Sequence, residues 1–451
     1  MKDSRYPQSP SRRLFVGMAA ATAAAGSLSR LAFAETNRAI AQAVQPAGGD
    51  KTAIRPLRVH IPESQLNDLR RRIKATRWPE RETVSDDSQG VPLAMIQDLA
   101  SRWSTDYDWR KCEARLNALP NYVTEIDGLD IHFIHVRSKH ENAMPLIVTH
   151  GWPGSVIEQL KIIDPLTNPT AYGASASDAF HLVVPSLPGY GFSGKPTTAD
   201  WGAARTARAW VVLMKRLGYA RFASQGGDLG GIVTNVMAKQ APPELLGIHI
   251  NFPATVPPEI VKALQVGGPP PAHLTDEEKQ AYEQLSRLSK RRAYALEMGT
   301  RPQTLYGLAD SPVGLASWLL DHPDGYGQPA AALSSAVFGR TLNGQSAGAV
   351  TRDDVLDDIT LYWLTNTGVS AARFYWASQF NFYAAADVSV PAAVSAFPGE
   401  NYQAPRSWSE RAYPNLIYYN RPDKGGHFAA WEQPLLFAEE VRAGLRPLRK
   451  A

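Results

Sequence analysis

The feature that most constrains the fold is an alternation of short apolar runs with helical stretches that begins near residue 121. Residues 121–126 and 131–136 flank the pair Asp127-Gly128, which favours a tight turn, so they are predicted to form a β-hairpin. Apolar strands then alternate with helical sequence, at residues 146–149, 181–185 and 222–225. This alternation is typical of βαβ units and predicts an α/β protein with a mostly parallel sheet flanked by helices.

The sequence before and after this alternating segment predicts other elements. Leu66, Leu69 and Ile73 lie at spacings of three and four, which predicts an amphipathic helix, and Ser64 is a candidate cap for its start. Strands are expected again at 392–397 and 416–419, before a last helix over 434–446. The predicted organisation is a leader (1–34), a linker (35–52), an N-terminal wrapping region (53–120), the first part of the core (121–255), an inserted helical cap (256–385) and the second part of the core (386–451).

The first 34 residues have the features of an export signal. Ser11-Arg12-Arg13-Leu14-Phe15 resembles the twin-arginine signature, and a weakly apolar stretch then ends in Ala32-Phe33-Ala34, an A-x-A cleavage pattern. A bilayer span needs about 20 strongly apolar residues, whereas Gly, Ser and Arg interrupt residues 14–34. We expect cleavage after Ala34, a periplasmic or extracellular location and no stable membrane anchor, with an uncleaved anchor as the alternative.

Charge and cysteine content narrow the possible partners. Five basic residues and one acidic residue within 1–34 account for the whole formal charge of +4, so the rest of the chain is nearly neutral. A neutral body lacks the basic footprint of a nucleic-acid-binding protein. Cys112 is the single cysteine, which excludes an internal disulfide and a multi-cysteine metal site. We predict no metal, no cofactor and no nucleic-acid partner.

A run of small residues surrounds one acidic residue after the strand at 222–225. In Gly226-Gly227-Asp228-Leu229-Gly230-Gly231 the small residues permit a sharp strand-to-helix turn, the nucleophile elbow of α/β-hydrolases. The reactive residue of such an elbow is most often Ser, and here it is Asp228. The alternative is a glycine-rich turn in which Asp228 only caps the helix.

A second loop supplies candidate donors for an oxyanion hole. His150-Gly151-Trp152-Pro153-Gly154-Ser155 follows the strand at 146–149, where this fold places one backbone N–H donor, and the second comes from the residue after the nucleophile. The predicted donors are therefore the N–H groups of Trp152 and Leu229. His150 itself is more typical of a structural residue that satisfies loop backbone groups.

The chain order of this fold places a base near the C-terminus, after an orienting acid. His427 follows two glycines in Gly425-Gly426-His427 and is the candidate base. Glu400, at the end of Phe397-Pro398-Gly399-Glu400, is the candidate acid. Glu410 and Asp423 are its rivals.

Together these motifs resemble the epoxide hydrolases, specifically the microsomal type with an added N-terminal region. The similarity covers roughly residues 53–445 and includes Thr76-Arg77-Trp78-Pro79 in that region. The resemblance implies the α/β-hydrolase fold and two cap tyrosines as proton donors. One is Tyr375, in an Arg-Phe-Tyr match, and the other is Tyr294, with Tyr306 as its rival. The family usually has Trp directly after the nucleophile, and Leu229 departs from that pattern.

The implied reaction converts a small apolar epoxide and water to a vicinal diol. A serine that attacked an epoxide carbon would leave an ether, which activated water cannot cleave, whereas Asp228 would leave a cleavable ester. His427, held by Glu400, would then activate the water. The alternatives are a haloalkane dehalogenase, a serine-type esterase or a non-catalytic binder of apolar ligands, and Leu229 with the paired tyrosines argues against the dehalogenase.

Overall fold

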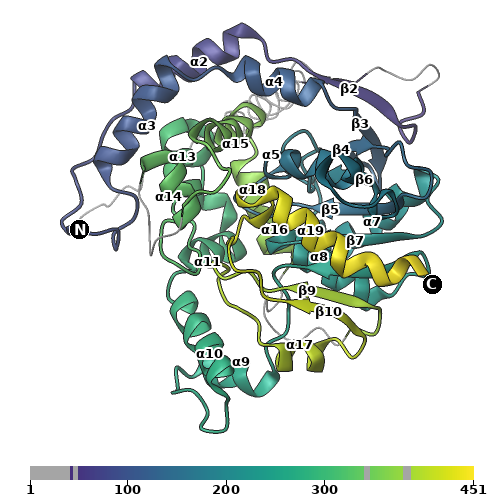
Figure 1. Ribbon diagram of the computed structural model, residues 1–451. Coiled ribbons are helices and arrows are strands. Elements are labelled where there is room, and N and C mark those ends of the chain that lie inside the picture. The colour runs from purple at the N-terminus through teal and green to yellow at the C-terminus, as the bar shows by residue number, and fades with distance from the viewer. Residues whose placement is uncertain (1–40, 44–48, 340–345, 379–387, 451) are drawn as a thin grey trace, which may run out of the picture.

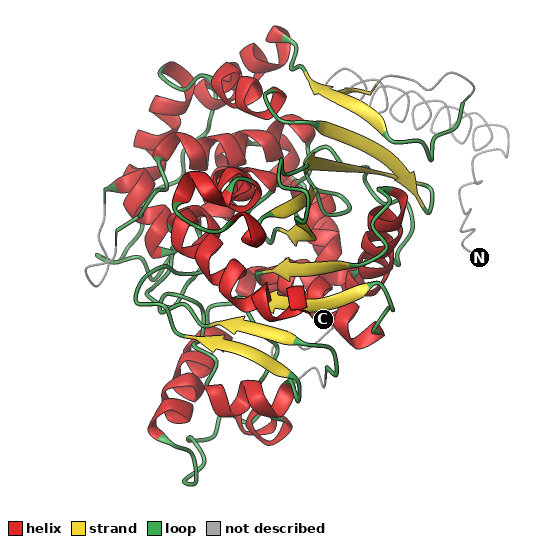
Figure 2. Cartoon of the chain, turned by 45° about the vertical axis from the view of Figure 1, so that its right-hand side comes forward, coloured by secondary structure: helices red, strands yellow, loops and turns green. Residues whose placement is uncertain are grey.

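Within the residues that the computed structural model describes (41–43, 49–339, 346–378 and 388–450), the strands form one ten-stranded sheet. The leader lies outside these residues. The strands are Ala41–Ala43 (β1), Arg55–Val59 (β2), Asn121–Ile126 (β3), Leu129–Val136 (β4), Met144–Thr149 (β5), Phe180–Pro185 (β6), Phe222–Gly226 (β7), Leu245–Ile250 (β8), Ala392–Ser395 (β9) and Leu416–Asn420 (β10). Their order in the sheet is β1-β2-β3-β4-β6-β5-β7-β8-β9-β10. Figure 2 shows the strands in yellow among the red helices.

The sheet divides into an antiparallel edge and a parallel body. Strands β1, β2, β3, β4 and β6 pair antiparallel in that order, and β6, β5, β7, β8, β9 and β10 pair parallel. The β3–β4 hairpin turns at Asp127 and Gly128, whose φ angles of 50° and 79° are both positive, as a type I′ turn requires. The predicted hairpin and parallel sheet are confirmed.

Helices cover both faces of the parallel body. Successive side chains of a strand point to opposite faces of the sheet, so successive β5 residues pack in two different apolar clusters. Ile147 packs with Ala203–Arg216 (α7) and Asp228–Gln240 (α8), whereas Leu146 and Val148 pack with Ile163–Thr167 (α6) and Pro434–Leu445 (α19). The core helices are Val156–Gln159 (α5), Ile163–Thr167 (α6), Ala203–Arg216 (α7), Asp228–Gln240 (α8), Arg406–Ala412 (α17), Ala429–Glu432 (α18) and Pro434–Leu445 (α19). Short 3₁₀ helices span Leu160–Ile162 (η1), Pro169–Tyr172 (η2), Ala176–Asp178 (η3), Pro302–Thr304 (η4) and Arg446–Lys450 (η5).

The N-terminal region forms an arch along the outside of the cap (Figure 1). Its helices are Glu63–Lys74 (α2), Leu93–Thr105 (α3) and Trp109–Asn117 (α4). Helix α2 buries the predicted apolar face of Leu66, Leu69 and Ile73. The predicted cap at Ser64 is wrong, because the helix begins at Glu63 after Pro62, whose fixed φ suits that boundary.

Part of the segment predicted as linker is a strand. Residues 41–43 form β1, which pairs antiparallel with β2 from Ala41 opposite Val59 to Ala43 opposite Leu57. The prediction of a linker throughout 35–52 is therefore wrong at these three residues. Their pairing satisfies backbone groups along the outer edge of β2, which the polar, Ala-rich sequence did not indicate.

The cap helices fall into two groups. The first two cap helices, Pro258–Gln265 (α9) and Asp276–Ser289 (α10), pack with Tyr402 and with Trp408 of α17 in a separate apolar cluster. The later cap helices, from Ala293–Thr300 (α11) to Gly368–Ser378 (α16), lie beneath the N-terminal arch (Figure 1). Of the described helices, none is long and apolar enough to cross a membrane. The cap helices are Pro258–Gln265 (α9), Asp276–Ser289 (α10), Ala293–Thr300 (α11), Gly307–Asp310 (α12), Pro312–Leu320 (α13), Ala331–Phe338 (α14), Arg352–Thr365 (α15) and Gly368–Ser378 (α16).

Candidate active site

Asp228 lies at a strained turn between β7 and α8. Its φ is +47°, a left-handed value that is uncommon for a residue other than glycine. The turn needs its glycines, because a Cβ at Gly230 would collide with the carbonyl oxygen of Thr149 and a Cβ at Gly226 with that of Gly230. The N-cap of α8 is Gly227 rather than Asp228, and the Asp228 carboxylate contacts the Trp152 N–H and His427.

The loop after β5 supplies a backbone donor to Asp228. The N–H of Trp152 donates to Asp228 Oδ1 at 2.9 Å. Leu229 is fully buried in the first turn of α8, where backbone N–H groups have no partner within the helix. His150 has the structural role that the sequence suggested, because its Nε2 accepts the Leu187 N–H at 3.1 Å, and burial lowers its pKa to about 4.

The loops after β9 and β10 bring Glu400 and His427 together. A parallel bridge between Gly399 and Gly426 joins the two loops. Glu400 Oε1 lies 2.5 Å from His427 Nδ1 and also accepts the Asn401 N–H at 2.7 Å. The opposite ring nitrogen, His427 Nε2, lies 3.5 Å from Asp228 Oδ2.

The rival acids lie elsewhere. Glu410 is on α17, where its exposed carboxylate pairs with Arg406 at 2.7 Å. Asp423 is exposed. Of the three candidate acids, only Glu400 contacts His427.

The buried carboxylates control the protonation of His427. Burial alone would lower its pKa, but Glu400 and then the hydrogen bond to Asp228 outweigh burial and raise the pKa well above its usual value. Burial raises the pKa of Asp228, but the hydrogen bond and the charge of His427, with smaller contributions from His322 and the Trp152 N–H, together outweigh burial and lower the pKa. The resting site therefore holds an anionic Asp228 beside a cationic His427.

The two predicted tyrosines lie against the Trp152 indole. Tyr294, on α11, stacks on Trp152 with ring centroids 4.8 Å apart, and Tyr375, on α16, packs edge-on at 6.1 Å. The two phenol rings are 6.2 Å apart. Burial raises the pKa of Tyr375 well above its usual value, so its hydroxyl stays protonated. The rival Tyr306 is 66% exposed and lies away from this group.

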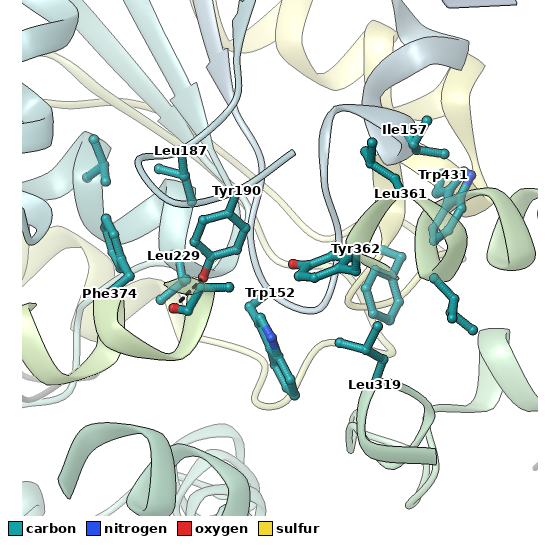
Figure 3. Close-up of a cluster of buried hydrophobic side chains, with 14 of the residues drawn as sticks. Trp152, Ile157, Leu187, Tyr190, Leu229, Leu319, Leu361, Tyr362, Phe374 and Trp431 are labelled. Carbon is teal, nitrogen blue, oxygen red and sulfur yellow. Dashed lines mark hydrogen bonds between the residues drawn. The ribbon is translucent and has the colours of Figure 1, made fainter. Parts of the chain in front are cut away.

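Helix α15 supports the Trp152 loop from the cap side. The Tyr362 hydroxyl donates to the Gly154 carbonyl at 2.9 Å, and Ser155 Oγ donates to Asp358 at 2.5 Å. In Figure 3, Trp152 lies between Leu229 on one side and Tyr362 on the other.

The same helix is bound to the N-terminal arch. The Tyr107 hydroxyl donates to Asp357 at 2.6 Å, and Trp103 Nε1 donates to Thr360 at 2.9 Å. Both contacts are buried. The N-terminal arch therefore braces the Trp152 loop through α15.

A small polar cavity lies beside Asp228. It has a volume of about 20 Å³, and a cavity of about 10–15 Å³ on this measure suffices for one water molecule. Asp228 and His427 line it together with Glu158, whose pKa burial raises to about 7, and with Gln225 and Asn251.

One residue of the site is not indicated by the sequence. His322, between α13 and α14, is fully buried, and its ring lies 4.6 Å from that of His427. Among the described residues, Asp228, His322 and His427 form one group whose ligand-type atoms lie within 4.8 Å of one another, so they are the residues that can reach a common metal ion. No motif surrounds His322, so no local signal indicated it.

Comparison with known proteins identifies the family. Residues 54–159 match the model for the epoxide hydrolase N terminus, and residues 144–295 match the α/β hydrolase fold. The chain is 49% identical to a Stigmatella aurantiaca protein named "Putative epoxide hydrolase", over 88% of this chain and 86% of that protein. It is 34% identical to epoxide hydrolase 1 of Sus scrofa, over 88% and 90%.

Comparison with solved structures indicates the same family. The crystal structure of juvenile hormone epoxide hydrolase from Bombyx mori has a TM-score of 0.76 and 30% identity, and covers 89% of this chain and 96% of its own. The chain belongs to the epoxide hydrolases of the microsomal type and hydrolyses epoxides on an α/β-hydrolase fold.

Proposed function

We propose that epoxide hydrolysis proceeds in this chain through a covalent ester on Asp228. One observation carries the proposal. The Asp228 carboxylate has one oxygen on the Trp152 N–H and the other beside His427, and Glu400 holds the far side of that imidazole. With this hydrogen bonding, Asp228 is placed to act as a nucleophile and His427 to act as the base.

In the first step, Asp228 Oδ attacks a ring carbon of the epoxide. A new carbon–oxygen bond forms, the ring carbon–oxygen bond breaks, and its electron pair goes to the leaving oxygen. Tyr294 and Tyr375 donate hydrogen bonds to that oxygen, and one of them gives it a proton. Both phenol rings contact Trp152, so they converge above the loop that binds Asp228.

In the second step, His427 removes a proton from water, and the water oxygen attacks the ester carbonyl of Asp228. Alkylation converts the Asp228 anion to a neutral ester, which removes one of the two carboxylates that raise the pKa of His427. The imidazole then loses its proton more readily and becomes a base. Before water is activated, the tyrosinate left by the first step regains a proton as the imidazolium loses one. The Trp152 and Leu229 N–H groups stabilise the tetrahedral oxyanion. Its collapse breaks the bond between the Asp228 carbonyl carbon and the substrate oxygen, that oxygen takes the proton that His427 removed from water, and the diol leaves as the Asp228 carboxyl group is restored.

The substrate class follows from the surroundings of these groups. Trp152 lines the cavity beside Asp228 and belongs, with Leu229 and Phe374, to one buried apolar cluster (Figure 3). We therefore propose small apolar epoxides as substrates. A cavity of about 590 Å³ lies between the cap and the core loop at 196–201, and Phe374 lines it next to Tyr375 in the chain. Its position suits the entry of such a substrate.

The test is diol formation from a panel of aliphatic and aryl epoxides. The chain with Asp228→Ala should produce no diol, because it lacks the nucleophile. Asp423→Ala is the matched control, since Asp423 is exposed on the His427 loop and should be dispensable. Full turnover by Asp228→Ala would overturn the mechanism, and halide release from haloalkanes without diol formation would point to a dehalogenase.

We further propose that the twin-arginine-type leader exports the folded chain and is removed after Ala34. The support is the sequence of residues 11–34. The measurement is the N-terminal mass of the exported protein. A chain that starts at Glu35 is expected, and one that still starts near Met1 would contradict the proposal.

A further inference from the structure

His322 contacts the proton-donating side of the site as well as the base. Its Nε2 lies 3.3 Å from the Tyr294 hydroxyl oxygen, and its ring packs on His427 and on Phe428. We infer that His322 is a positioning residue that donates its Nε2–H to the Tyr294 oxygen and so directs the tyrosine proton toward the epoxide oxygen. This inference rests on the proposed role of Tyr294.

The direction of the hydrogen bond follows from the other ring nitrogen. His322 Nδ1 is buried and has no hydrogen-bond partner in the part of the chain that the structure describes. Burial, followed by repulsion from His427, lowers the pKa of His322 well below its usual value, so the ring is neutral and carries one proton. A buried N–H without an acceptor is rarer in proteins than a buried acceptor without a donor. The proton is therefore assigned to Nε2, the nitrogen that faces Tyr294.

This arrangement affects how Tyr294 can act. A phenol whose oxygen accepts a hydrogen bond can still donate its own O–H to another acceptor, which in the proposed mechanism is the epoxide oxygen. The Tyr294 ring contacts the rings of Trp152 and Tyr375 on that side of the site. A donor to the phenol oxygen also stabilises the phenolate that remains after the proton has moved. The opposite tautomer would draw the tyrosine proton to His322 and away from the substrate.

The experiment measures the rate of alkylation in a single turnover. All variants carry His427→Gln, which is expected to block hydrolysis so that the ester accumulates, and ester is quantified by mass after acid quench. His322→Phe removes the donor and retains an aromatic ring, and we expect about 10-fold slower alkylation, because a hydrogen bond contributes about 1–1.5 kcal/mol. His322→Gln restores a neutral N–H donor and should recover most of the rate.

A second background separates hydrogen bonding from a structural role. In chains that also carry Tyr294→Phe there is no hydroxyl to orient, so His322→Phe should cause no further slowing. Equal slowing with and without the Tyr294 hydroxyl, or no recovery by His322→Gln, would overturn the inference. If Tyr294→Phe alone leaves alkylation unchanged, the proposed acid is wrong. If Tyr294→Phe slows alkylation but His322→Phe does not, the role of His322 alone is wrong.

Discussion

Neutralising Glu400 without changing its shape tests how much its charge contributes to hydrolysis of the ester. Glu400 is 1% exposed, and Oε1 is 2.5 Å from His427 Nδ1. In Glu400→Gln the amide oxygen still accepts that N–H and the Asn401 N–H, so the imidazole keeps its orientation. The negative charge that stabilises the imidazolium during water activation is lost.

The magnitude follows from the distance. Two unit charges about 4 Å apart attract by about 4 kcal/mol at an effective dielectric constant of about 20. The ring and carboxylate charge centres lie at about this separation when the facing atoms are 2.5 Å apart. About 4 kcal/mol corresponds to roughly 10³-fold in rate. Ester hydrolysis should slow by about that factor, whereas alkylation should change little because Asp228 remains ionised.

The assay is rapid-quench kinetics with one epoxide that the native chain turns over. Glu400→Gln should give a burst of ester close to one per chain, followed by slow diol release. Glu410→Gln is the matched control, because Glu410 is exposed and pairs with Arg406, and it should behave like the native chain. Less than a fivefold loss for Glu400→Gln, or an equal loss for Glu410→Gln, would refute the assignment of the orienting acid.

Three further predictions concern stability. Tyr107→Phe removes the buried hydrogen bond from Tyr107 to Asp357, which keeps its ion pair with Arg115. It should lower the free energy of unfolding in urea by about 1–3 kcal/mol, whereas Tyr306→Phe, at an exposed site, should not. Gly230→Ala places a Cβ against the Thr149 carbonyl and should lower the free energy of unfolding by about 3 kcal/mol or more. In the control Gly299→Ala, on α11, the added Cβ meets no neighbouring atom, so the free energy of unfolding should rise slightly. Burial raises the pKa of Glu432 from 4.5 to about 8, so the folded chain keeps a proton on Glu432 that the unfolded chain releases. The free energy of unfolding should therefore fall as the pH rises from about 4.5 to 8, by up to about 1.4 kcal/mol per pH unit. In Glu432→Gln, the contribution of Glu432 to this pH dependence of the free energy of unfolding should be lost, as urea unfolding curves across this pH range would show. An unchanged pH dependence would show that Glu432 is not protonated in the folded chain.

Much of the sheet and the nucleophile elbow could be predicted because their signals are local. The Asp127-Gly128 turn, the apolar strands and the glycines around Asp228 each constrain the backbone within a few residues. The position of Glu400 after a strand predicts it as the orienting acid, and the bridge between Gly399 and Gly426 brings that position next to His427.

The features that the sequence did not reveal depend on long-range packing. His322 is a single histidine in a loop, and its neighbours Tyr294 and His427 come from segments distant in the chain. Asp357 and Asp358 are acidic residues of the kind expected on a solvated helix face. They are buried because α15 lies between the N-terminal arch and the Trp152 loop, and each face supplies a hydroxyl donor. No pattern within α15 encodes both partners.

The most direct test of the covalent mechanism is the intact mass of the His427→Gln chain after exposure to an epoxide, followed by peptide mapping. We expect a mass increase equal to one epoxide on the peptide that contains Asp228, and no increase when Asp228→Ala is added. An adduct on another residue, or diol formation by His427→Gln at the native rate without any adduct, would contradict it.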